Sequence, residues 1–258
     1  MFPPAIEEIP TDSEFILQRG DSSASAALEV LVREHFAALR QLAAALTDDP
    51  ARASQAARQA LLQAVQQRAA YQGQTTPRAW LVPFLLRGLD SASPSKPPPP
   101  LPNHPILRTV YTLERRAARL VVLTHLQGYT IPEASAALRL REPRALLLLT
   151  GAHRHLSPAL SAAPPHPHYR ALLETAVLGP LDGASAAALE DHLADCSACQ
   201  AYLAARQTAQ EACAAALAEA YPLEPLSPEA AEALVEDLTA EIAARPPRRR
   251  FSLRSETL

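Results

Sequence analysis

Three residues with the chemistry of transition-metal ligands lie close together late in the sequence. His192, Cys196 and Cys199 are separated by four and three positions, and a continuous helix would place all three on one face. Imidazole nitrogen and thiolate sulfur are the ligands that zinc prefers in structural sites. The spacing therefore predicts three ligands of a structural zinc site, carried on one helix.

A structural zinc ion takes four ligands in a tetrahedral arrangement, so the triplet needs one more. His166 and His168 precede it and are the main candidates. His153, His155 and Cys213 are weaker candidates, since Cys213 follows about four helical turns later. The alternative is a surface histidine beside two half-buried cysteines. Three ligand types at helical spacing favour the metal over that alternative.

The composition indicates which elements position these residues. Aromatic residues make up 5% of the chain and glycine occurs only 7 times, whereas alanine, leucine, arginine and glutamate, which are good helix formers, dominate. We therefore expect an all-α fold. The 25 prolines cluster in a few segments and mark breaks between helices.

Other features of the sequence exclude several functional classes. Three cysteines in 258 residues do not make a disulfide scaffold, and a net charge of −3 gives no overall basic field for nucleic acid. Neither a membrane span nor a signal peptide is expected, which predicts a cytoplasmic protein. The known catalytic motifs are missing, so we expect neither an enzyme nor a small-molecule substrate.

Proline-rich segments divide the chain into predicted units. The helical pattern before the first such segment is amphipathic, and the pattern after it has the outline of a helix-turn-helix. The predicted units are a flexible leader at 1–24, a helical unit at 25–90, a proline-rich linker at 91–105, a helix-turn-helix unit at 106–157, a second linker at 158–167, a zinc-binding unit at 168–220, and a C-terminal helix with a basic tail at 221–258.

Residues 166–203 resemble the zinc-binding anti-sigma domain. The likeness includes a Leu-Gly-Pro-Leu turn at 178–181, followed by the His-x3-Cys-x2-Cys pattern. In that family a cysteine or histidine opens the first helix, and alignment on the turn places His166 there, with His168 as the near alternative. The resemblance therefore implies a Zn²⁺ site formed by His166, His192, Cys196 and Cys199. It also implies contact with a sigma-like partner, here within the same chain.

Residues 31–85 are similar to region 2 of extracytoplasmic-function sigma factors, best at Arg-Ala-Trp-Leu, residues 78–81. This resemblance implies that Gln55, Gln59 and Trp80 contact the core RNA polymerase. The family offers an acidic helix at this place, but residues 55–62 contain no carboxylate. Loss of that charge would weaken steering and specificity at the polymerase interface.

Residues 113–138 are similar to sigma region 4, which reads the promoter −35 element. The presumed recognition helix at 142–156 carries four consecutive leucines at 146–149, which cannot read base edges by hydrogen bonding. The arginines that could still hold DNA phosphates are Arg139, Arg141, Arg144 and Arg154. The leucine run predicts that the zinc-binding unit or the final helix covers this helix.

These features together predict a transcription regulator: a sigma-like protein controlled by its own fused anti-sigma domain. The alternative is a degenerate sigma scaffold that acts through protein–protein interaction, without promoter binding. With His166 as fourth ligand, Cys196 and Cys199 are the only thiol pair in the site. A disulfide between them would not tie two helices together, so we expect a structural zinc ion rather than a redox sensor.

Overall fold

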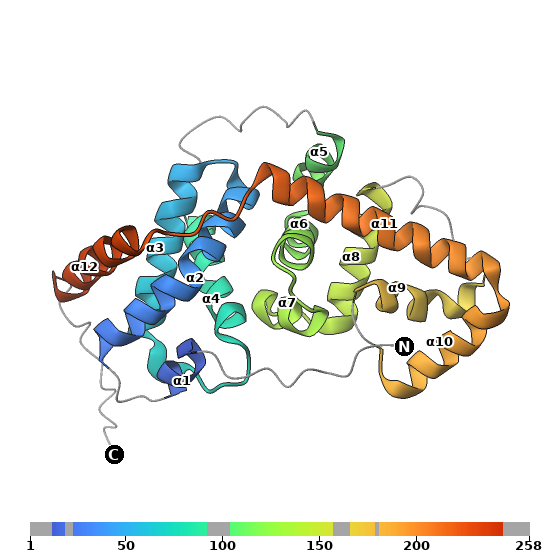
Figure 1. Cartoon of the computed structure of the whole chain (residues 1–258), viewed down its shortest axis with the longest axis horizontal. Coiled ribbons are helices and arrows are strands. Elements are labelled where there is room, and N and C mark those ends of the chain that lie inside the picture. Colours follow the sequence, from blue (N-terminus) through green and yellow to red (C-terminus); the bar gives the residue numbers. More distant parts are fainter. Residues whose placement is uncertain (1–11, 19–22, 92–103, 157–165, 179–180, 245–258) are drawn as a thin grey trace, which may run out of the picture.

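The computed structural model describes residues 12–18, 23–91, 104–156, 166–178 and 181–244, and every regular element in these ranges is a helix (Figure 1). The predicted all-α fold is therefore confirmed. None of the described helices is both long enough and apolar enough to cross a membrane. Both proline-rich linkers fall almost wholly outside the described residues, as does the basic tail.

The first helical unit is built around a long helical hairpin. Its elements are α1 (Asp12–Gln18), α2 (Ala24–Thr47), α3 (Pro50–Gln66), the short 3₁₀ helix η1 (Arg68–Ala70) and α4 (Pro77–Ser91). The hairpin turn follows from local chemistry: Asp48 adopts a left-handed backbone, and the Asp49 carboxylate accepts hydrogen bonds from the first turn of α3. In the segment expected to be a flexible leader, α1 packs on α2 through the buried Leu17.

The second helical unit contains the predicted helix-turn-helix. Its elements are α5 (Pro105–Thr112), α6 (Arg115–Val121), the π-helix η2 (Val122–Leu126), α7 (Ile131–Leu138) and α8 (Glu142–Leu156). The helix that begins at Pro105 ends at Thr112, because Leu113 is extended and the Glu114 side chain caps α6 through the Ala117 amide. A capping box between Thr130 and Glu133 begins α7.

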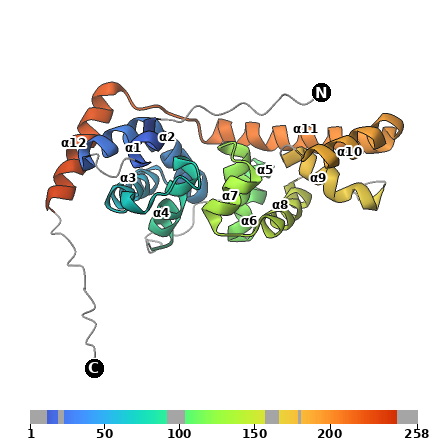
Figure 2. The same ribbon diagram turned by 90° about the horizontal axis from the view of Figure 1, so that it is seen from below.

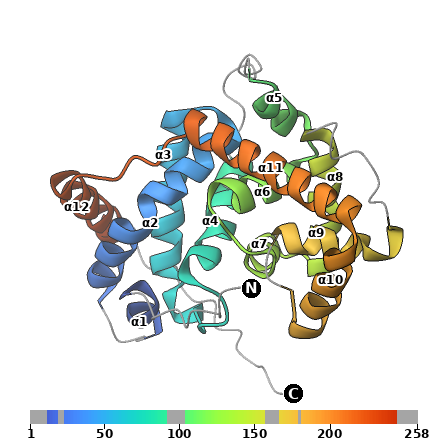
Figure 3. The ribbon, with the colours of Figure 1, turned by 45° about the vertical axis from the view of Figure 1, so that its right-hand side comes forward.

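The C-terminal part of the chain starts as a small helical unit and then extends over the other two. Its elements are the 3₁₀ helix η4 (Pro167–Tyr169), α9 (Arg170–Leu178), α10 (Gly183–Asp195), α11 (Ser197–Ala220) and α12 (Pro228–Ala244). Helix α11 runs from α9 and α10 across the second unit, where it contacts α5, η2 and α8 (Figures 1 and 2). Helix α12 then packs on α2 and α3 of the first unit (Figure 3).

Apolar packing divides the described residues into two cores. A large continuous core joins the first two units and includes Cys213 and Leu217 of α11 together with Leu234 and Leu238 of α12. A small separate core lies between α9, α10 and the start of α11 and is centred on Leu173, Leu189 and Cys199. Helix α11 therefore belongs to both cores, with its first turn in the small one and its last turns in the large one.

Polar contacts connect the units at defined points. Arg78 of α4 makes a two-pronged ion pair with Glu133 of α7, with nitrogen–oxygen distances of 2.8 Å. After α11, the Tyr221 hydroxyl bonds to Tyr111 of α5 and donates to the Asp48 carboxylate at 3.1 Å. The segment between α11 and α12 is thereby fixed to both helical units.

Candidate metal centre

Four side chains from three separate places in the chain converge at the start of α11. The ligand atoms of His166, His192, Cys196 and Cys199 all lie within 4.8 Å of one another. The Nδ1 atom of His166 is 3.2 Å from Nε2 of His192, 3.5 Å from Sγ of Cys196 and 3.6 Å from Sγ of Cys199. The structure thus brings together the four residues that the sequence predicted as ligands.

The three distances from Nδ1 of His166 fit the edges of a tetrahedral N₂S₂ metal site. With metal–nitrogen bonds of about 2.05 Å and metal–sulfur bonds of about 2.3 Å, the edges of a tetrahedron are about 3.3 Å between two nitrogens and about 3.5 Å between nitrogen and sulfur. The observed separations from His166 agree with these edges to about 0.1 Å. Two thiolates and two neutral imidazoles also balance the charge of a divalent cation. The donor set can therefore hold one such ion.

The helical arrangement of the triplet differs from the prediction. Helix α10 ends at Asp195 and α11 begins at Ser197, and Cys196 between them has the non-helical angles φ −119° and ψ 89°. His192, Cys196 and Cys199 therefore do not lie on one helix. The break at Cys196 turns the chain so that the last turn of α10 and the first turn of α11 face His166 across a common point.

Helix ends and ring stacking position the individual ligands. Both cysteines lie at the N-terminus of α11, with Cys196 directly before its first residue and Cys199 in its first turn. The His192 ring stacks on Tyr169, with centroids 3.7 Å apart and an interplanar angle of 11°. This stacking fixes the plane of the imidazole and hence the direction of its Nε2 lone pair.

The surroundings also set the protonation of the ligands in the absence of an ion. Burial, together with the neighbouring rings of His166 and His168, lowers the pKa of His192, which favours the neutral imidazole that donates to a metal. Burial raises the pKa of the Cys199 thiol, with a further contribution from Cys196. Cation binding would therefore have to displace the Cys199 proton.

The other candidates for the fourth ligand lie outside the group. The exposed His168 ring has its centroid 5.8 Å from that of His166 and 6.5 Å from that of His192. Cys213 is buried in the large core, His153 is buried in α8, and His155 is exposed. Among the described residues, His166 is therefore the histidine that completes the site.

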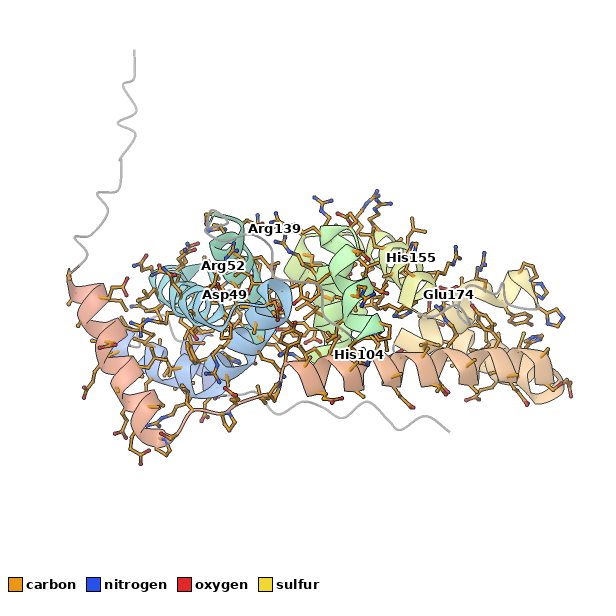
Figure 4. All side chains as sticks on the ribbon, turned by 90° about the horizontal axis from the view of Figure 1, so that it is seen from above. Asp49, Arg52, His104, Arg139, His155 and Glu174 are labelled. Atoms are coloured by element: carbon orange, nitrogen blue, oxygen red, sulfur yellow. The ribbon has the colours of Figure 1, made fainter. Side chains whose placement is uncertain are left out.

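A buried ion pair joins the small unit to the middle of α11. Glu174 of α9 (Figure 4) accepts a hydrogen bond from Arg206 of α11 at 3.2 Å. The two residues are 3% and 1% exposed. No pattern in the sequence indicates this pair, because 32 positions separate the partners and neither residue belongs to a motif.

The four arginines predicted to hold DNA phosphates are all exposed, but they do not form one group. Arg139, Arg141 and Arg144 lie around the turn between α7 and α8, with Arg139 on the side of the second unit that faces away from α11 (Figure 4). Arg154 lies near the other end of α8, where its charge acts on Tyr202 of α11. DNA binding by these residues stays a prediction.

Other helices cover the leucine run at 146–149 of α8 in part, as predicted. Leu149 is fully buried and Leu148 packs against the large core, but Leu147 is 60% exposed. The expectation that this run is buried is therefore wrong for Leu147. Helix α11 contacts α8, as expected of a lid from the zinc-binding unit, whereas α12 lies on the first unit instead. The reason is that α8 already packs on α6, so α11 needs to cover only part of its circumference.

The predicted polymerase contacts lie in the first unit. Gln55 is exposed and Gln59 is half-buried on α3, while Trp80 is half-buried on α4 in edge contact with Tyr71 and Phe84. Between the two glutamines, Arg58 lies 3.5 Å from Asp237 of α12. Helix α12 therefore reaches the helix on which the polymerase contacts were predicted.

Comparison with known proteins gives one match. A family model described as "Putative zinc-finger" matches residues 168–200. The matched segment contains His192, Cys196 and Cys199 and begins two residues after His166, which lies outside the match but within the group of four ligand atoms. No curated protein and no solved structure matches the chain. This part of the chain is therefore similar to a zinc finger, and the likeness of residues 31–138 to sigma factors stays a prediction.

Proposed function

We propose that the chain is a transcription regulator of the anti-sigma type, in which a zinc-binding unit restrains two sigma-like helical units of the same polypeptide. The observation that carries this proposal is the path of α11 and α12. One continuous helix connects the metal cluster to the second unit, and the next helix packs on the first unit. A single C-terminal segment thus contacts both units that a sigma factor would use.

The ion in the cluster is proposed to be zinc. Two sulfur and two nitrogen donors at tetrahedral spacing are typical of structural zinc sites, and the zinc-finger match covers three of the four ligands. The ion would hold η4, α10 and α11 together around a core in which the described residues include only three that are buried and apolar. Such a small core gains much of its stability from the metal.

Restraint of the first unit would come from α12. Leu234 and Leu238 are buried against α2 and α3, and Arg58 of α3 lies beside Asp237. Arg40 of α2 donates to the Glu224 carboxylate at 2.8 Å in the segment that leads into α12. Polymerase approaching α3 near Gln55 and Gln59 would therefore meet α12 first.

The test compares two single substitutions on α12 in the full-length protein. Leu238→Glu places a carboxylate at a fully buried position, where an unpaired charge is costly, so it should undock α12. Ala240→Glu adds the same charge at an exposed position and serves as the control. Hydrogen exchange of residues 228–244 reports undocking, and pull-down with core RNA polymerase reports binding.

We expect Leu238→Glu to bind core polymerase more strongly than the wild type and Ala240→Glu. Unchanged binding by an undocked Leu238→Glu variant would contradict restraint by α12. If neither the wild type nor the variants bind polymerase, the sigma-like role is excluded. The second candidate, an interaction scaffold, would then be retained; the exposed Leu147 on the helix that should read DNA favours it.

A further inference from the structure

A buried pair of histidines lies in the second unit, away from the metal cluster. His125 belongs to the π-helix η2 and His153 to the last turn of α8. Their Nε2 atoms are 2.9 Å apart, and the rings are 7% and 2% exposed in the order given. A π-helix is rare and often marks a functional position. Two imidazoles in direct contact inside a protein have to share a proton.

The hydrogen bonds around the pair connect it to Thr124. The Thr124 hydroxyl lies 2.9 Å from the Leu120 carbonyl oxygen and 2.7 Å from Nδ1 of His125. Between the two Nε2 atoms, one nitrogen donates a single hydrogen and the other accepts it. The pair is neutral. A second proton would leave both Nε2 atoms as donors and would break the hydrogen bond between them.

Helix α11 covers the two elements that carry the pair, since it packs against both η2 and α8. Arg206 of this helix is 1% exposed, and its Nε and Nη1 atoms have no hydrogen-bond partner among the described residues; the same holds for Oε1 of Gln210 one turn later. On another side, α8 packs against α6, whose Leu120 and Val121 are fully buried. Separation of α11 would therefore hydrate these polar groups, together with the apolar Cys213 and Leu217 of the same helix.

The charges around the pair oppose protonation. Burial lowers the pKa of His153, and the His125 ring and the Arg206 guanidinium lower it further. Burial also raises the pKa of Cys213 on α11 to about 12, so this thiol stays neutral. Charged or titratable side chains on the other packed elements are engaged elsewhere: Glu133 of α7 with Arg78, Arg119 of α6 with Asp90, Tyr111 of α5 with Tyr221, Arg40 of α2 with Glu224, and His35 of α2 with Ser13. No carboxylate among the described residues bonds to either ring.

We propose that His125 and His153 form an acid-sensitive latch, which holds α11 on the second unit while both rings are neutral and releases it when they are protonated. Protonated rings need water, and α11 is the cover over both elements of the pair that also carries buried polar atoms without hydrogen-bond partners among the described residues. The latch is a property of the α11 contact. It goes beyond the proposed function, because it does not depend on what the second unit binds.

The size of the effect follows from the burial of His125. Burial lowers its pKa from 6.5 to about 4 in the closed form, and release returns the ring to its ordinary value. The contact is then fully stable above pH 6.5 and loses stability as pH falls toward 4. From pH 7 to pH 5, the ratio of closed to open forms should fall about 20-fold for this one ring.

The experiment is hydrogen exchange of the full-length, zinc-loaded protein at pH 7 and pH 5, corrected for the intrinsic exchange rate. Protection of residues 206–220 in α11 should fall about 20-fold or more in the wild type. The double variant H125Q/H153Q keeps a neutral donor and acceptor near the two Nε2 positions and should lose most of this pH dependence. His155→Gln, at an exposed position of the same helix as His153, should behave like the wild type.

Zinc content is measured in the same samples, because the metal site also binds protons. The latch is overturned if protection does not change in the wild type, or if it falls equally in the double variant, as it would if zinc release were the cause. Should the double variant fail to fold, an NMR titration of the wild-type imidazoles decides the matter. Both rings must be neutral at pH 6 in the folded protein; a charged ring at that pH refutes the latch.

Discussion

Replacement of His166 by alanine removes one of four donor atoms at the proposed zinc site, whereas the same change at His168 should leave the donors intact. Nδ1 of His166 lies 3.2–3.6 Å from the other three donors, but His168 is outside this group, and its ring centroid is 6.5 Å from that of His192. Only two positions separate these residues. The pair of variants therefore tests the geometry and not merely the presence of histidine.

The magnitude can be estimated from the number of ligands. A structural zinc site contributes about 10–16 kcal/mol of binding free energy, so an equal share for each of four ligands is about 2.5–4 kcal/mol. This corresponds to a roughly 100- to 1,000-fold weaker affinity for zinc. The His168→Ala variant should retain an affinity within a few-fold of the wild type.

The assay is competition for zinc with a chromogenic chelator at pH 7, together with the metal content of protein purified without added zinc. We expect one zinc per chain for the wild type and His168→Ala, and rapid loss of the metal from His166→Ala. Retention of zinc by His166→Ala with loss from His168→Ala would refute the assignment. Retention by both variants would show that His166 is not a ligand at all.

Three further predictions concern stability. Glu174→Gln should lower the free energy of unfolding by about 3 kcal/mol, because it leaves the charge of Arg206 buried without its partner; thermal unfolding measures this, and an unchanged melting temperature would contradict it. Leu238→Ala should cost about 2–5 kcal/mol through the cavity it creates under α12, whereas Ala240→Gly, at an exposed position of the same helix, should cost only about 1 kcal/mol. Burial, with a smaller effect of Arg78, lowers the pKa of His35 to about 4. The neutral ring therefore contributes about 3 kcal/mol to the free energy of unfolding above pH 6.5, and this contribution is lost as pH falls toward 4. A His35→Gln variant should show a flatter pH dependence in chemical denaturation, and an unchanged profile would count against this reasoning.

Local patterns in the sequence were sufficient to predict most of the helices. The amphipathic pattern before the first proline-rich segment forms α2 and α3, and the C-terminal helix expected within 221–258 is α12. Helix formation depends on neighbours three and four positions apart and on capping residues, and these can be read directly from the chain. The types of the metal ligands were equally visible, because zinc chemistry selects cysteine and histidine.

The tertiary structure decided what the local patterns could not. The break at Cys196 is a single non-helical residue inside an alanine-rich stretch, and no strong helix breaker marks it. The contact between His125 and His153 spans 28 positions, and the contact between Glu174 and Arg206 spans 32. Which apolar faces pair depends on the three-dimensional fit of all the helices at once, so the placement of α11 on the second unit and α12 on the first was not predictable from periodicity. The sequence determined which residues could bind a metal and where helices form; the packing determined that His166 faces the cysteines and that two histidines meet beneath the helix that joins the units.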